Sequence, residues 1–220
     1  MVHFLAQLVS PLNRVLFHLG NDAVSWAELL GFLTGGWCVW LTVRSHIANF
    51  PVGIANSAFF LVLFASTRLW ADSGLQIVYL TLGIVGWRQW LRGGVNRSAL
   101  VVSRASRSIL LSCLAFVVAG TIGLTILLRA VNDVAPFWDA LTTALSLAAQ
   151  WLLNTKKIQT WWFWIAADCV YIPLYAAKRL ELTALVYVLF LGMCVAGVMA
   201  WRRIYHEQSI ASSASRALVA

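Results

Sequence analysis

A carboxylate, Asp168, lies in the middle of an apolar and aromatic stretch that is long enough to cross a lipid bilayer. Helical spacing places Trp161, Trp164, Tyr171 and Tyr175 on the same face as Asp168, because steps of three and four residues return to one side of a helix. A carboxylate near the bilayer centre costs about 3 kcal/mol or more unless it faces a protein-lined cavity. Aromatic rings beside it offer stacking surfaces and hydrogen-bonding groups. The pattern therefore predicts a solute site inside a membrane protein.

A second apolar segment repeats this one-face pattern, with Gln76, Tyr79 and Gly83 at steps of three and four residues. The amide of Gln76 can both accept and donate hydrogen bonds. Asn56 and Asn154 add amide groups in two other apolar segments. The predicted substrate-binding residues are Gln76, Tyr79, Asn56, Asn154, Trp161, Trp164, Asp168 and Tyr171.

Several of these residues have a structural alternative. Asp168 and Asn56 could instead tie neighbouring helices together through hydrogen bonds. Trp161 and Trp164 lie near the end of their segment, where tryptophan commonly forms an interfacial belt. The shared face with Asp168 favours the binding role for both tryptophans.

Catalytic and metal-binding chemistry has no candidate constellation in the sequence. There is no HExxH, GxSxG or phosphate-binding loop, the four histidines lie in tails or loops, and the four cysteines form no CxxC pair. We therefore expect no cofactor, no metal and no ATP-driven transport. An intramembrane enzyme acting on a lipid or nucleoside is the alternative from another functional class.

Composition indicates a membrane protein. Of the 220 residues, 61% are hydrophobic and only 11% are charged, with a mean hydropathy of +0.80, whereas soluble domains carry about 25% charged residues. The net charge of +8 comes from basic residues scattered between apolar runs. No stripe or motif for nucleic acid accompanies them, so we expect a lipid bilayer and no nucleic acid as the partner.

Seven apolar segments approach the roughly 20 residues that a membrane-spanning helix needs. They cover residues 26–43, 52–70, 72–91, 109–128, 137–154, 161–177 and 182–201. This predicts an all-α integral membrane protein with its transporter domain over residues 22–203 and a cytoplasmic tail over 204–220. Residues 1–21 are short of a full span, and their near-helical apolar spacing predicts an N-terminal amphipathic helix at the membrane interface, with a short extra span as the alternative.

Residues 26–91 and 137–203 resemble each other after a shift of about 112 positions, which places Ala55-Asn56 on Ala167-Asp168. Residues 109–130 would form a single linker helix between these two three-helix repeats. An intervening span gives both repeats the same orientation, so the sequence predicts seven helices in a 3+1+3 parallel-repeat arrangement. Parallel repeats place a solute site at their interface near the midplane, where rocking alternates access.

Lys and Arg residues indicate the orientation. With seven spans, eleven of them lie on the side of the C-terminus and five on the other side. The C-terminus is therefore predicted to be cytoplasmic and the N-terminus outside.

Two signatures of a known family follow one another in the chain. The first is Leu69-Trp70-Ala71-Asp72-Ser73-Gly74-Leu75-Gln76 followed by Tyr79, and the second is Trp161-x-x-Trp164 followed by Asp168 and Tyr171. Over residues 26–203 the chain resembles the PnuC-type nicotinamide riboside transporters. One departure is Trp70, where the family more often has tyrosine.

The resemblance implies a fold related to the SWEET sugar transporters, a homotrimer, and a multi-pass location in the bacterial inner membrane. It also implies uptake of nicotinamide riboside, a vitamin B3 form and NAD precursor, by facilitated diffusion with alternating access. A cytoplasmic kinase would then trap the imported compound. Aromatic faces suit the cationic pyridinium ring, and the absence of a midspan Lys or Arg predicts rejection of the mononucleotide. A carrier of another nucleoside or of a sugar is the alternative within transport.

Overall fold

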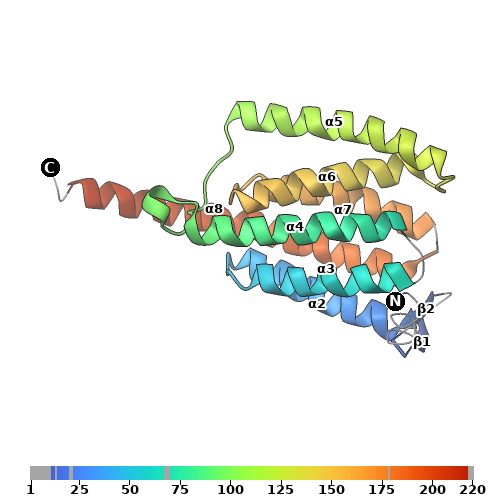
Figure 1. The fold of residues 1–220 in the computed structure, drawn as a ribbon. Coiled ribbons are helices and arrows are strands. Elements are labelled where there is room, and N and C mark those ends of the chain that lie inside the picture. Colours follow the sequence, from blue (N-terminus) through green and yellow to red (C-terminus); the bar gives the residue numbers. More distant parts are fainter. Residues whose placement is uncertain (1–10, 13, 20–21, 67–69, 178, 218–220) are drawn as a thin grey trace.

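The computed structural model describes residues 11–217, apart from 13, 20, 21, 67–69 and 178 (Figure 1). Seven long helices occupy the predicted spans: α2 (Trp26–Val43), α3 (Asn49–Ser66), α4 (Trp70–Arg92), α5 (Arg107–Ala130), α6 (Pro136–Asn154), α7 (Thr160–Ala177) and α8 (Glu181–Ala217). A short 3-10 helix, η1 (Val95–Arg97), follows α4. Two antiparallel strands, β1 (Val15–Leu19) and β2 (Asp22–Ser25), precede α2.

The helices begin where the sequence supplies caps. At the start of α2, the Glu28 amide donates to Ser25 Oγ over 3.3 Å and the Ser25 amide donates back to the Glu28 carboxylate over 2.9 Å. This reciprocal pair satisfies two amides that the first turn leaves free. Asp139 and Glu181 lie in the first turns of α6 and α8, where a negative charge complements the helix dipole.

Four helices are long and apolar enough to cross a membrane by length and composition: Trp26–Val43, Asn49–Ser66, Arg107–Ala130 and Glu181–Ser213. Helix α5 shows the expected surface, because Leu111, Val118 and Ile126 are each about three-fifths exposed or more. Its buried residues, including Cys113 and Val117, face α6. Such an apolar exterior suits a lipid environment.

Six of the helices form a closed ring. Contacts run from α2 to α3, α4, α6, α7, α8 and back to α2. Helix α5 packs against α6 on the outside of this ring, at the top of Figure 1. The order of neighbours means that α2–α4 meet α6–α8 at two junctions, α4 with α6 and α8 with α2.

The starts of corresponding helices differ by 111 residues in two of the three pairs and by 110 for α2 and α6. Helix α3 begins at Asn49 and α7 at Thr160, while α4 begins at Trp70 and α8 at Glu181. This corrects the predicted shift of 112, so that Asp168 corresponds to Ser57 and not to Asn56. The sequence also agrees better with 111, which aligns Trp40 with Trp151 and Trp90 with Trp201. The difference matters because one residue turns a helix by about 100°.

The predicted N-terminal amphipathic helix is wrong where its segment is described. Residues 1–10, 13, 20 and 21 lie outside the described part of the chain, but Val15–Leu19 is a strand paired with β2. Short apolar runs do not distinguish helix from strand by periodicity alone. Val15 and Phe17 belong to the β-branched and aromatic types that favour strands.

Candidate solute-binding site

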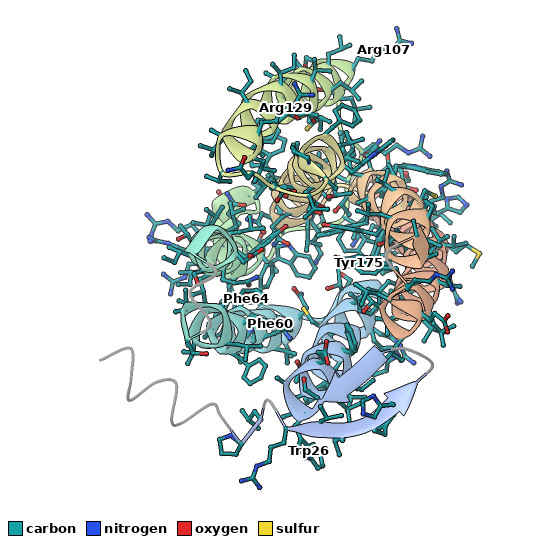
Figure 2. All side chains as sticks on the ribbon, turned by 90° about the vertical axis from the view of Figure 1, so that its right-hand side faces the viewer. Trp26, Phe60, Phe64, Arg107, Arg129 and Tyr175 are labelled. Carbon is teal, nitrogen blue, oxygen red and sulfur yellow. The ribbon has the colours of Figure 1, made fainter. Side chains whose placement is uncertain are left out.

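A cavity of about 400 Å³ lies inside the ring of six helices. Its described lining comes from α2, α3, α4, α6, α7 and α8, and none of it from α5. Figure 2 looks along the bundle and shows α5, with Arg107 and Arg129 labelled, at the outer edge of the molecule. This volume lies in the range of small-molecule sites.

The structure brings together seven of the eight predicted residues. Gln76, Tyr79, Asn56, Trp161, Trp164, Asp168 and Tyr171 all line the cavity. Asp168 is only 4% exposed, and Cys194 Sγ on α8 lies 3.6 Å from its Oδ2 atom as a weak donor. Among the described lining residues Asp168 is the only acid, and no Lys or Arg is present.

The two tryptophans of α7 belong to the interior and not to an interfacial belt. Trp161 is 1% exposed, and its indole N–H has no hydrogen-bond partner among the described residues. A buried donor without a partner costs about 1–3 kcal/mol. An acceptor atom of a solute, or a water molecule in the cavity, would remove this cost.

The two predicted asparagines hold helices together. Asn56 Nδ2 on α3 donates to Thr34 Oγ1 over 2.6 Å and to the Gly31 carbonyl over 3.2 Å, which joins α3 to α2. Asn154 is 2% exposed and lies behind the cavity lining. Its Nδ2 atom donates to the Leu82 carbonyl over 2.8 Å and so ties α6 to α4.

The sequence prediction missed a polar residue and an aromatic one. Gln150 lines the cavity from α6 and donates through Nε2 to Asn154 Oδ1 over 3.1 Å. Tyr187 lines it from α8, with its ring centroid 4.5 Å from that of Tyr171 and 5.3 Å from that of Tyr175. A shift of 111 residues between the two repeats would have identified Tyr187, because Tyr187 then corresponds to the predicted site residue Gln76.

The residues that line the two sides of the cavity are related by the same shift of 111 positions. Ten pairs of lining residues are 111 positions apart: Gly35 and Ser146, Val39 and Gln150, Thr42 and Leu153, Phe50 and Trp161, Gly53 and Trp164, Ser57 and Asp168, Phe60 and Tyr171, Gln76 and Tyr187, Tyr79 and Phe190, Gly83 and Cys194. In the pairs from α2–α3 and α6–α7, the second member is usually larger or more polar. The wall from α6 and α7 therefore carries most of the recognition chemistry, and the wall from α2 and α3 leaves space.

Metal chemistry finds no support in this interior. In the part of the chain that the structure describes, no three His, Cys, Asp or Glu side chains are grouped so that they could hold a metal ion. What the lining offers is stacking, hydrogen bonding and one negative charge.

A ring of apolar helices around a polar and aromatic cavity defines a membrane carrier, and the comparisons agree with this class. Residues 25–203 match the sequence profile of the nicotinamide mononucleotide transporter family. The chain belongs to this family, and it is a membrane protein of the transporter class and not an enzyme.

Similar proteins include carriers for different vitamins. The nicotinamide riboside transporter PnuC of Escherichia coli K12 is 23% identical over 219 residues, covering 86% of this chain and 92% of the relative. The riboflavin/roseoflavin transporter RibM of Streptomyces davaonensis is 25% identical over 199 residues, covering 86% and 91%. A crystal structure of the vitamin B3 transporter PnuC has a TM-score of 0.67 at 20% identity, covering 94% of this chain and 88% of that one. The last comparison shows a shared fold.

Proposed function

We propose that this chain takes up nicotinamide riboside by facilitated diffusion with alternating access. The observation that carries the proposal is the cavity in which Asp168, Trp161, Trp164 and Tyr171 line one wall. Relatives named as nicotinamide riboside transporters support the choice of ligand.

The chemistry of the lining suits this ligand. The pyridinium ring is planar and cationic, so Trp161 and Trp164 hold it by stacking and cation–π attraction, worth about 2 kcal/mol when desolvated. Asp168 balances the ring charge. The amides of Gln76 and Gln150 pair with the carboxamide or ribose hydroxyls, and the indole N–H of Trp161 finds its acceptor on the ligand. A phosphate group would find no basic side chain among the described lining residues, so the mononucleotide is rejected.

Transport follows from a 3+1+3 arrangement. Residues 26–91 and 137–203 act as two parallel repeats, joined by the linker helix predicted over 109–130, which corresponds to α5. A shift of 111 residues supports this division, because it relates two of the three pairs of helix starts and ten pairs of lining residues. Rocking of one repeat against the other exposes the cavity to each side in turn.

The protein works as a multi-pass carrier in the bacterial inner membrane. All seven helices span the bilayer, with the N-terminus outside and the C-terminus in the cytoplasm. The excess of Lys and Arg on the C-terminal side supports this orientation. The assembly is a homotrimer, as the family resemblance implies.

Riboflavin is a second candidate ligand. The riboflavin/roseoflavin relative RibM covers this chain as fully as the Escherichia coli nicotinamide riboside relative does. Riboflavin also presents a planar ring and hydroxyl groups, but its ring is uncharged. The charge of Asp168 therefore favours nicotinamide riboside.

Uptake into liposomes tests the proposal. Purified protein is reconstituted, and entry of labelled nicotinamide riboside is followed without any proton or sodium gradient. Saturable entry that stops at equal concentrations is expected, and Asp168→Asn should slow it at low ligand concentration. Trp162→Phe is the matched control, because Trp162 lies on the same helix and is half-exposed. Saturable entry of riboflavin alone would show that riboflavin, and not nicotinamide riboside, is the ligand. Accumulation that needs an ion gradient would overturn facilitated diffusion.

A further inference from the structure

Two tryptophans connect helices α2–α4 with helices α6–α8 at one end of the cavity. Trp90 Nε1 on α4 donates to the Leu153 carbonyl on α6 over 2.9 Å, and Trp201 Nε1 on α8 donates to the Thr42 carbonyl on α2 over 2.9 Å. Both donors and both acceptors are 111 positions apart. The two hydrogen bonds are therefore equivalent, and each crosses one of the two junctions that close the ring.

These tryptophans stand directly behind aromatic residues that line the cavity. Phe50 packs edge-on against Trp90 with ring centroids 5.0 Å apart, and Trp161 packs edge-on against Trp201 at 5.5 Å. The centroids of Trp90 and Trp201 are 5.9 Å apart, which joins both pairs into one cluster. Phe50 and Trp161 line the cavity, whereas Trp90 and Trp201, at 3% and 0% exposure, lie beyond them. The cluster separates the cavity from the loops after α4 and α6.

One half of the cluster has additional support. Lys156, in the loop after α6, lies 4.3 Å above the centroid of the Trp90 ring and donates to the Leu100 carbonyl over 3.0 Å. The Leu100 amide in turn donates to the Trp90 carbonyl over 2.9 Å. The residue that corresponds to Lys156 in the register of 111 is Ser45, which carries no cation for Trp201. The Trp201 half is therefore held less firmly than the Trp90 half.

We propose that Phe50, Trp90, Trp161 and Trp201 form the gate at this end of the cavity, and that the two indole–carbonyl hydrogen bonds hold it shut. The inference rests on the proposed transport function, since a gate has a purpose only if a solute passes. Opening moves α4 away from α6 and α8 away from α2, so both bonds break in the same motion. Each buried N–H must then be solvated, which makes opening a defined step and not a gradual loosening.

The access of water-soluble reagents to the cavity tests the gate without any ligand. Cys194 lines the cavity and is buried. The variant Cys38→Ala, Cys113→Ala, Cys169→Ala keeps Cys194 as its single thiol. A charged, membrane-impermeant methanethiosulfonate is added to membrane vesicles of known sidedness, and the rate of Cys194 modification is measured from each side.

Replacing an indole by a phenyl ring removes one hydrogen bond and keeps an aromatic group. Trp90→Phe and Trp201→Phe are each expected to raise modification by about fivefold from the side where α8 extends beyond the bundle, with the larger effect for Trp201→Phe. The double variant should exceed both. Trp151→Phe is the matched control, because Trp151 lies near the same end but is exposed; its rate should equal that of the parent.

Three results would overturn the proposed gate. The rate of Cys194 modification from the side where α8 extends could stay unchanged in both variants, the rate could rise equally from both sides, or it could rise as much in Trp151→Phe. Uptake of nicotinamide riboside by the same variants separates this inference from the proposed function. Uptake with unchanged access leaves a transporter without this gate, and changed access without uptake leaves the gate but removes the ligand.

Discussion

Asp168 is the residue on which the choice of a cationic ligand depends. It is buried, its described hydrogen-bond partner is the weak donor Cys194, and it corresponds to the smaller, neutral Ser57 on the opposite wall. A carboxylate with so few structural partners is poorly explained as a tie between helices. A cation in the cavity would offset the cost of burying the charge.

Asp168→Asn keeps the shape of the side chain and removes its charge. We expect the dissociation constant for nicotinamide riboside to rise about tenfold or more, which corresponds to ~1.4 kcal/mol. Calorimetric titration of the purified variant measures it, beside Cys169→Ala on the neighbouring, exposed position. Unchanged affinity in a folded Asp168→Asn protein would remove Asp168 from the site.

Asn154 has a structural role in the same region. Its side chain donates to the Leu82 carbonyl and accepts from Gln150, so it joins α6 to α4 behind the lining. Asn154→Ala removes both hydrogen bonds and leaves the Gln150 amide without this acceptor, which costs about 1–3 kcal/mol. We expect a lower melting temperature in detergent with ligand affinity reduced much less than in Asp168→Asn. The reverse pattern would make Asn154 a ligand contact.

At the level of helices, two glycines set how closely α8 approaches α7 and α4 approaches α3. A Cβ atom on Gly197 of α8 would lie 2.5 Å from ring atoms of Trp161, and a Cβ atom on Gly86 of α4 would lie 2.5 Å from the Phe50 ring. These glycines are also 111 positions apart. Each provides the flat surface against which a cavity-lining aromatic ring of the gate rests.

Gly197→Ala should therefore displace Trp161. Overpacking of this kind costs about 1–3 kcal/mol, and we expect both a lower melting temperature and weaker ligand binding. Gly192→Ala on the same helix is the matched control, since a Cβ atom there would meet nothing within 4 Å. Equal behaviour of the two variants would show that the contact between α8 and Trp161 is unimportant.

Sequence patterns could predict the helices and much of the cavity lining. Apolar length located the seven segments, and one-face spacing brought Gln76, Tyr79 and Asp168 to a common interior. The role of Asn154 could not be predicted, because the sequence of an apolar helix does not show whether an amide faces a cavity or a carbonyl of a neighbouring helix. The strand at Val15–Leu19 was missed because its four apolar residues fit either period.

The register between the repeats was the other limit. The shift of 112 rests on a few matches such as Trp26 with Trp138, whereas a shift of 111 aligns more identical residues, among them Gly86 with Gly197 and Trp90 with Trp201. The two shifts place different residues opposite Asp168. Contacts decide between them, because Trp90 and Trp201 make equivalent hydrogen bonds only at 111. The correspondence of Tyr187 with Gln76 follows from the same register.

For the whole molecule, basic residues are more numerous at one end of the bundle than at the other. Arg92 is the last residue of α4, and Arg202 and Arg203 follow the cluster residue Trp201 in α8. Figure 1 shows α8 extending beyond the bundle at this end, on the left. Glu28, in the first turn of α2, lies at the opposite end. This distribution is the physical basis of the predicted orientation.

A reporter fused after Ala220 tests that orientation. We expect activity of a cytoplasmic reporter and none of one that requires export, because the basic residues hold this end inside. A fusion in the loop between α5 and α6, which follows Ala130, should give the opposite result. Export of the C-terminal reporter would contradict both the orientation and the count of seven spans.

The most direct test of the central claim is calorimetric titration of the purified protein with nicotinamide riboside, beside riboflavin, nicotinamide, uridine and nicotinamide mononucleotide. Binding of the riboside at micromolar concentrations or below, without comparable binding of the others, is the predicted result. Absence of riboside binding by folded protein, or tighter binding of riboflavin or the mononucleotide, would contradict the assignment of the cavity to nicotinamide riboside.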